Sequence, residues 1–86
     1  MKKNLIVVTG GAGFVGSNLI SLLLKKTKFM IISIDDYSTG KKENHLNNRR
    51  VTYIKENTKN INQILKKKKN KIKTIFHFGE FSRIYQ

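Results

Sequence analysis

The 86-residue sequence contains no cysteine, so disulfide bonds and thiolate metal sites are excluded. It also lacks any apolar run that approaches the roughly 20 residues of a membrane-spanning helix. An apolar run at residues 5–8 follows two lysines, but glycines interrupt it after four residues, which does not suit a signal peptide. We therefore expect an unprocessed cytoplasmic protein without a membrane partner.

Acidic side chains are scarce: five Asp and Glu stand against 18 Lys and Arg, for a formal net charge of +13. Such a charge favours nucleic acid or an anionic membrane surface as a partner. However, 15 of the basic residues are Lys, whereas recognition of phosphate groups and guanine favours Arg. Lys, Asn and Ile make 35 of the 86 residues, a bias typical of low-GC coding sequences. We predict no specific nucleic-acid partner and keep a basic nucleic-acid-binding module as an alternative.

Apolar runs alternate with amphipathic segments along the chain. Four strands are predicted from their apolar, β-branched composition, at residues 4–9, 30–34, 51–55 and 74–78. Two helices are predicted from apolar residues at helical spacing, at 14–26 and from Asn60 to Lys69, with one helical turn near 43–46. This order predicts an α/β protein with part of a Rossmann-like, doubly wound parallel sheet, of about four strands in the order 3-2-1-4.

The segment between the first strand and the first helix is rich in glycine. Gly10, Gly13 and Gly16 have the spacing G-x-x-G-x-x-G, and residues 11–16 also satisfy G-x-G-x-x-G. Glycine at such positions allows a positive-φ bend, a close approach of the backbone to a pyrophosphate, and tight packing of helix on strand. The N–H groups at the start of the helix then meet the phosphate charge. We predict a dinucleotide-binding turn.

Asp35 follows Gly16 by 19 positions and stands at the predicted tip of the second strand. A carboxylate there can accept hydrogen bonds from both hydroxyls of an adenosine ribose, and its charge repels a 2'-phosphate. The sequence therefore predicts NAD, rather than NADP, as the cofactor.

Three blocks of sequence, in this order, resemble the NAD-dependent epimerase/dehydratase family. They are residues 9–16, Asp35-Asp36-Tyr37-Ser38-Thr39-Gly40 and Ile75-Phe76-His77-Phe78-Gly79. The family comprises the extended short-chain dehydrogenases/reductases, among them nucleotide-sugar epimerases such as UDP-glucose 4-epimerase. The resemblance covers essentially the whole chain. It implies a Rossmann fold, NAD as cofactor, and a sugar-nucleotide substrate in a full-length relative, whose reaction moves hydride between NAD and the sugar.

The resemblance also implies which residues contact the cofactor. Along the pyrophosphate it places Gly10, Gly13, Phe14, Val15 and Gly16. Asp35 would hold the ribose, and the wall beside the adenosine would consist of Asp36, Ser38, Thr39 and Gly40.

Two further groups of contacts follow from the same resemblance. Asn57 and Thr58 match an Asp-Ile pair that lies beside the adenine in relatives, and an amide oxygen can accept from the adenine amino group. Phe78, Gly79 and Glu80 would run beside the nicotinamide half, with Glu80 where relatives usually carry alanine.

In this family the general base is the Tyr of a Tyr-x-x-x-Lys pair, assisted by a Ser or Thr from the fifth strand. We expect the chain to lack this catalytic pair, since Tyr85 is followed only by Gln86. His77 is interpreted as structural, on a buried strand, and His45, in the polar loop, has even less support for a catalytic role. Residues 1–86 are thus interpreted as the N-terminal portion of an NAD-binding domain, truncated before the catalytic and substrate-binding parts and inactive alone. An inactive remnant is a further alternative, and no oligomeric state is predicted.

Overall fold

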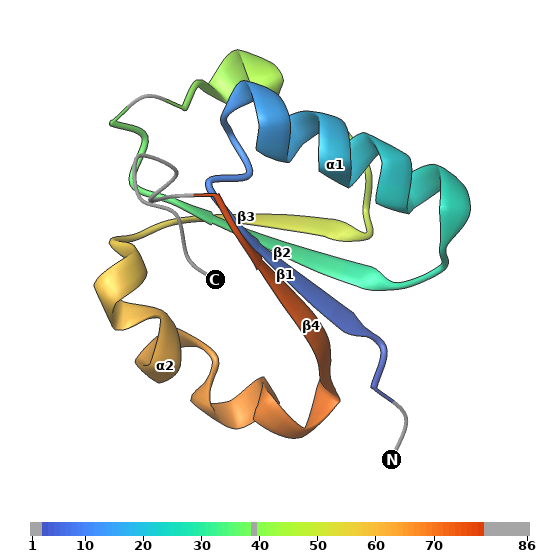
Figure 1. The fold of residues 1–86 in the computed structure, drawn as a ribbon, viewed down its shortest axis with the longest axis vertical. Helices are drawn as coiled ribbons and strands as arrows, with labels where there is room; N and C mark the ends of the chain where they lie inside the picture. The colour runs from blue at the N-terminus through green and yellow to red at the C-terminus, as the bar shows by residue number, and fades with distance from the viewer. Residues whose placement is uncertain (1–2, 39, 79–86) are drawn as a thin grey trace.

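The computed structural model describes residues 3–38 and 40–78, which form one parallel sheet with helices on its two faces (Figure 1). The strands within this part are β1 (Leu5–Thr9), β2 (Met30–Asp35), β3 (Val51–Lys55) and β4 (Ile72–His77). All neighbouring strands pair in parallel, in the order β3-β2-β1-β4. The sheet order predicted from the sequence is confirmed, and with it the Rossmann-like α/β fold.

The helical elements divide between the two faces of the sheet. Figure 1 shows α1 (Phe14–Lys26) on one face and α2 (Ile61–Ile64) on the other. The described part of the chain also contains three short 3-10 turns: η1 (Lys42–Asn44), η2 (Thr58–Asn60) and η3 (Lys66–Lys71). None of the helices in the described ranges combines the length and apolarity that crossing a bilayer requires.

Strand β1 is the centre of the core, because all five of its residues are buried. Successive side chains of a strand point to opposite faces, so β1 contributes to two apolar layers. Leu5 and Val7 pack with Leu65 on the α2 face, whereas Ile6 and Val8 pack with Ile20 on the α1 face. A central strand covered on both sides explains the continuous apolar run in the sequence.

The second helical segment departs from the prediction. Its α-helical part is only four residues long, and η3 takes the place of the expected continuation to Lys69. Consecutive lysines repel one another at helical spacing and offer no apolar side chain to bury, so they do not support a longer helix. Asn60 stands at the N-cap, but its side chain makes no capping bond and instead donates to Glu56 Oε1 at 3.2 Å.

Strand β4 also differs from the expectation of a buried strand. It begins at Ile72 rather than residue 74, because Leu5 pairs with Ile72 before the register shifts between Leu5 and Ile6. Its residues alternate between half-buried and exposed, and His77 falls on the exposed set. Within the described sheet β4 pairs with β1 alone, so only one of its edges is covered.

Arg50 closes the C-terminal end of α1 from the start of β3. Its guanidinium donates to the carbonyl oxygens of Leu24 at 2.5 Å, Thr27 at 2.7 Å and Phe29 at 3.4 Å. The last carbonyls of a helix have no partner within the helix, and a cation there also suits the helix dipole. Arg50 therefore ties the C-terminal end of α1 to the start of β3.

We predict that Arg50→Ala lowers the free energy of unfolding by about 1–3 kcal/mol, because the variant leaves partly buried carbonyl groups without their charged donor. Urea unfolding followed by circular dichroism measures the change. Arg49→Ala is the matched control: Arg49 is exposed, and its loss is expected to change stability by less than about 0.5 kcal/mol. Equal losses for the two variants would show that Arg50 does not act as a helix clamp.

Candidate functional site

The predicted site residues that the structure describes lie at the carboxyl ends of the strands. In register, Thr9 at the end of β1 pairs with Ile34 of β2 and His77 of β4, and Asp35 pairs with Lys55 at the end of β3. The chain leaves β1 through α1 on one face and reaches β4 through α2 on the other. Ligands of open parallel sheets bind where the connections diverge in this way.

The glycine loop makes a tight turn between β1 and α1. Gly10 has a φ of 74°, which favours glycine, and its N–H donates to Ile34 O at 2.7 Å. Gly16 packs against the loop so closely that a Cβ there would lie 2.2 Å from Gly10 O. Gly13 is less crowded, since the nearest atom to its Cβ would be Gly10 O at 3.3 Å. In the G-x-x-G-x-x-G spacing, Gly10 thus makes the bend, Gly13 leaves open space, and Gly16 allows the close contact.

The loop rests on the side chain of Ser33. A Cβ at Gly11 would meet Ser33 Oγ at 1.9 Å, so no side chain fits there unless Ser33 moves. Ser33 Oγ is buried and, within the described residues, has no hydrogen-bond partner. A small residue in β2 therefore makes room for the turn at the cost of an unsatisfied hydroxyl.

Helix α1 begins with backbone N–H groups that have no acceptor within the helix. Its N-cap is Gly13, which offers no side-chain cap, and its first turn contains no acidic residue. The N–H of Ser17 is the first to bond back, to Gly13 O, so the N–H groups of residues 14–16 lack intrahelical acceptors. Phe14 and Val15 are 78% and 58% exposed. Such a helix start suits an anion flanked by apolar surface.

Asp35 lies directly beside this loop and is buried, with 6% of its surface exposed. Its Oδ2 accepts a hydrogen bond from Ala12 N at 3.0 Å, and its Oδ1 accepts one from Tyr37 N at 2.8 Å. Each carboxylate oxygen has two lone pairs, so both can accept further bonds from hydroxyl groups. The carboxylate predicted to hold a ribose thus also joins β2 to the glycine loop.

The segment after Asp35 folds back over the same loop. Asp36 Oδ1 accepts from Ser38 N at 2.9 Å, and this hydrogen bond lowers the pKa of Asp36 below its ordinary value. Gly40 returns so close that a Cβ there would lie 2.7 Å from Asp35 Oδ2 and 2.8 Å from Ala12 Cβ. The wall predicted beside the adenosine therefore contacts both Asp35 and the glycine loop, while Thr39 lies outside the described residues.

The remaining predicted contacts lie at the ends of β3 and β4. Asn57 follows β3, where its Oδ1 accepts from Lys59 N at 2.8 Å, and Thr58 begins η2. Phe78 N donates to Thr9 O at 2.9 Å and to Thr9 Oγ1 at 3.0 Å, which holds Phe78 beside the end of β1. Gly79 and Glu80, predicted beside the nicotinamide, fall outside the described residues.

The structure adds an aromatic cluster that the sequence did not indicate. His45 stacks on Tyr53 with ring centroids 3.7 Å apart and an interplanar angle of 8°. The Tyr37 hydroxyl and His45 Nε2 form a hydrogen bond of 2.5 Å, and Tyr53 accepts from Leu46 N at 2.8 Å. Tyr37 has a φ of 63°, an uncommon value for a non-glycine residue. His45 thus links the segment after β2 to β3 through its contacts with Tyr37 and Tyr53.

Tyr37 and Lys41 require a correction to the predicted lack of a Tyr-x-x-x-Lys pair. Four positions separate them, so the pattern is present in the sequence. On a helix this spacing would place both side chains on one face. Here Tyr37 has a left-handed backbone and Lys41 is extended, with a φ of −131°, and the Tyr37 hydroxyl contacts His45. The spacing is present without the helical geometry that the pattern implies.

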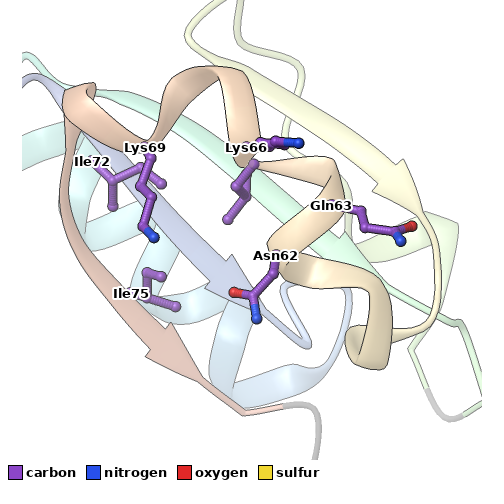
Figure 2. Close-up of a pocket in the computed structure, with 7 residues that line it drawn as sticks. Asn62, Gln63, Lys66, Lys69, Ile72 and Ile75 are labelled. Atoms are coloured by element: carbon purple, nitrogen blue, oxygen red, sulfur yellow. The ribbon is translucent and has the colours of Figure 1, made fainter.

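A separate groove lies on the α2 face of the sheet. Figure 2 shows Ile72 and Ile75 of β4 on one side and Asn62 and Gln63 of α2 on the other. The cavity measures about 390 Å³, and two lysines, Lys66 and Lys69, also line it. None of the described residues that line the groove belongs to the predicted cofactor set, so the groove is separate from the candidate site at the glycine loop.

We predict that Gly16→Ala lowers the free energy of unfolding by about 1–3 kcal/mol, because its Cβ would collide with backbone atoms of Gly10 and Gly11. Gly13→Ala is the control, expected to cost less because its Cβ meets no atom closer than 3.3 Å. Thermal and urea unfolding of the two variants measure the difference. Similar losses at both positions would contradict the close packing of Gly16.

Burial raises the pKa of Tyr37 above its ordinary value of 10.0, and the charge of Asp35 adds to the shift. The neutral phenol is therefore favoured by folding, so its contribution to stability is present below pH 10 and is lost as pH rises through the higher pKa of the folded state. The difference in tyrosinate absorbance between wild type and Tyr37→Phe isolates this titration. A midpoint at or below 10 would contradict the prediction.

Comparison with known proteins agrees with this architecture. The profile of the NAD dependent epimerase/dehydratase family matches residues 6–85. A UDP-glucuronic acid decarboxylase of Arabidopsis thaliana is 51% identical over 39 residues, which are 45% of this chain and 11% of that protein.

Two solved structures are similar over most of the chain. A UDP-glucose 4-epimerase from Thermotoga maritima, solved with UDP-glucose, has a TM-score of 0.71 and 29% identity over 86% of this chain and 23% of its own. A dTDP-glucose 4,6-dehydratase from Bacillus anthracis, in complex with NAD, has a TM-score of 0.73 and 27% identity. The match covers 86% of this chain and 26% of the dehydratase chain. The chain thus spans about a quarter of these structures. It belongs to the NAD dependent epimerase/dehydratase family.

Proposed function

We propose that the chain binds NAD through the glycine loop and the ends of β2 and β3, as the cofactor-binding part of a nucleotide-sugar epimerase or dehydratase. The observation that carries this proposal is the uncapped start of α1 beside the buried carboxylate of Asp35. The start of α1 would offer N–H donors to a pyrophosphate, and the Asp35 carboxylate would offer lone pairs to ribose hydroxyls. The hydrogen bond from Ala12 N to Asp35 Oδ2 supports the proposal, because it brings the glycine loop next to this carboxylate.

The residues present suit a dinucleotide. The backbone N–H groups of Phe14, Val15 and Gly16 would hold the pyrophosphate, and Gly13 leaves room for its approach. Asp35, Gly40 and Asn57 would surround the adenosine. NAD supplies reversible hydride abstraction from a substrate carbon when it is bound. The protein's part in this region is to bind and orient the cofactor.

The activity of a complete enzyme is a further part of the proposal. Among the relatives are an epimerase solved with UDP-glucose and a dehydratase solved with NAD. By this likeness we propose a sugar nucleotide as the substrate of a full-length protein of which residues 1–86 form the N-terminal cofactor-binding portion. Because Tyr37 and Lys41 lack the geometry of a catalytic pair, we expect no turnover from these 86 residues alone. The cytoplasmic location predicted from the sequence stays a prediction.

We predict that the chain binds NAD at least about tenfold more tightly than NADP, because Asp35 repels a 2'-phosphate. Isothermal titration calorimetry at about 150 mM salt measures both affinities, since screening at that ionic strength weakens general attraction to the basic surface. That attraction favours the more anionic NADP, so a preference for NAD must come from the site. A folded chain that shows no heat of binding with millimolar NAD would refute the proposed function.

Asp35→Asn removes the charge with little change of shape and is expected to abolish the preference for NAD. Glu43→Gln removes the same charge from an exposed position of η1 and should leave the preference intact. If Asp35→Asn unfolds, the ratio of the two affinities in the wild type still decides whether the site discriminates. Equal affinities there would count against Asp35 as the ribose anchor.

A further inference from the structure

Both the N–H and the carbonyl group of Ala12 make hydrogen bonds. Ala12 is fully buried, and its N–H donates to Asp35 Oδ2. Its carbonyl oxygen accepts two hydrogen bonds, from Asn44 Nδ2 at 2.7 Å and from Lys41 N at 3.0 Å. Neither donor belongs to the residues predicted to contact the cofactor. Asn44 supplies the one side-chain donor, across 32 positions of sequence.

Asn44 is itself firmly placed. It closes η1, where its N–H donates to Lys41 O at 3.0 Å and the next residue, His45, donates its N–H to Lys42 O at 2.9 Å. The His45 ring is stacked on Tyr53 of β3, which fixes η1 against the sheet. Figure 1 shows η1 next to the first turn of α1. The Asn44 amide therefore reaches the Ala12 carbonyl from a hydrogen-bonded turn.

The position of the Ala12 carbonyl matters for the helix start. This carbonyl shares a planar peptide group with the N–H of Gly13, which donates to Gly10 O at 3.1 Å. Gly13 is the N-cap of α1, and its own carbonyl accepts the first helical hydrogen bond, from Ser17 N. Rotation of the peptide between Ala12 and Gly13 would therefore tilt the first turn and redirect the N–H groups of residues 14–16.

We propose that Asn44 is a positioning residue for the pyrophosphate site: by donating to the Ala12 carbonyl it fixes the peptide that aims the free N–H groups of α1. The inference rests on the proposed binding of a dinucleotide. Asn44 acts through Ala12 and does not touch the ligand. Lys41 N–H holds the same carbonyl, so loss of the Asn44 amide loosens the loop without releasing it. N–H groups that already point toward the anion bind it more tightly, because the loop loses less conformational entropy on binding.

NMR titration of the whole chain with ADP and with adenosine tests this role. Asn44→Ala is expected to weaken ADP binding roughly three- to tenfold, the loss that corresponds to one neutral hydrogen bond. Adenosine affinity should change less than about twofold, because adenosine has no pyrophosphate. Asn44→Asp, which keeps the shape but cannot donate and adds a negative charge beside the Ala12 carbonyl, should weaken ADP binding at least as much as Asn44→Ala. Asn47→Ala, an exposed position in the same loop, is the control and should match the wild type.

Amide hydrogen exchange without ligand provides the second readout. In Asn44→Ala the amides of Ala12 and Gly13 should exchange faster, while those of Val7 and Val8 in β1 stay unchanged. Equal weakening of ADP and adenosine would indicate a merely structural role and overturn the inference, as would unchanged ADP affinity. A wild type that binds neither ADP nor NAD would instead refute the proposed function. Exchange at Ala12 and Gly13 would then still decide whether Asn44 fixes the loop.

Discussion

The hydrogen bond between Ala12 N and Asp35 Oδ2 is the contact on which the site depends. A buried carboxylate is costly unless donors satisfy it, and here two backbone N–H groups, those of Ala12 and Tyr37, do so. The bond joins the end of β2 to the loop after β1. Gly40 lacks a side chain where it meets both partners, and Tyr37 adopts a positive φ where its N–H reaches Asp35. The local backbone is thus arranged around one carboxylate.

The two faces of the sheet are covered unequally. α1 has 13 residues and packs along the strands, whereas α2 has four and leaves a groove beside β4. The cause lies in the sequence from 57 to 78, which contains seven lysines and no acidic residue. Such a segment has few apolar side chains with which to cover a sheet. The candidate site lies beside the start of α1, on the well-covered face.

Membership of the epimerase/dehydratase family agrees with the position of the polar contacts in the described residues. The chain spans about a quarter of the solved structures that it resembles, and its described contacts concern the glycine loop and the strand ends. Tyr37 and Lys41 show why spacing alone does not identify a catalytic pair. A pattern defined on a helix acquires its meaning from the helical backbone, which Tyr37 and Lys41 do not adopt.

Local patterns in the sequence determined the element order, the sheet order 3-2-1-4 and the position of the glycine turn. Each depends on residues close in the chain: apolar runs of strand length, glycines three apart, and an acid directly after an apolar strand. The bounds of α1 and β3 were predicted correctly for the same reason. The length of α2 was not, because helix propensity and lysine repulsion compete there and only packing decides between them.

Tertiary structure alone decided which distant polar groups meet. Asn44 reaches Ala12, Arg50 reaches the end of α1, and His45 stacks on Tyr53. The first two contacts join residues 32 and 26 positions apart, across loops whose course no periodicity records. Asp35 shows both levels at once: its spacing from Gly16 indicated a ribose anchor, and only the folded loop revealed that the same carboxylate holds the glycine turn in place.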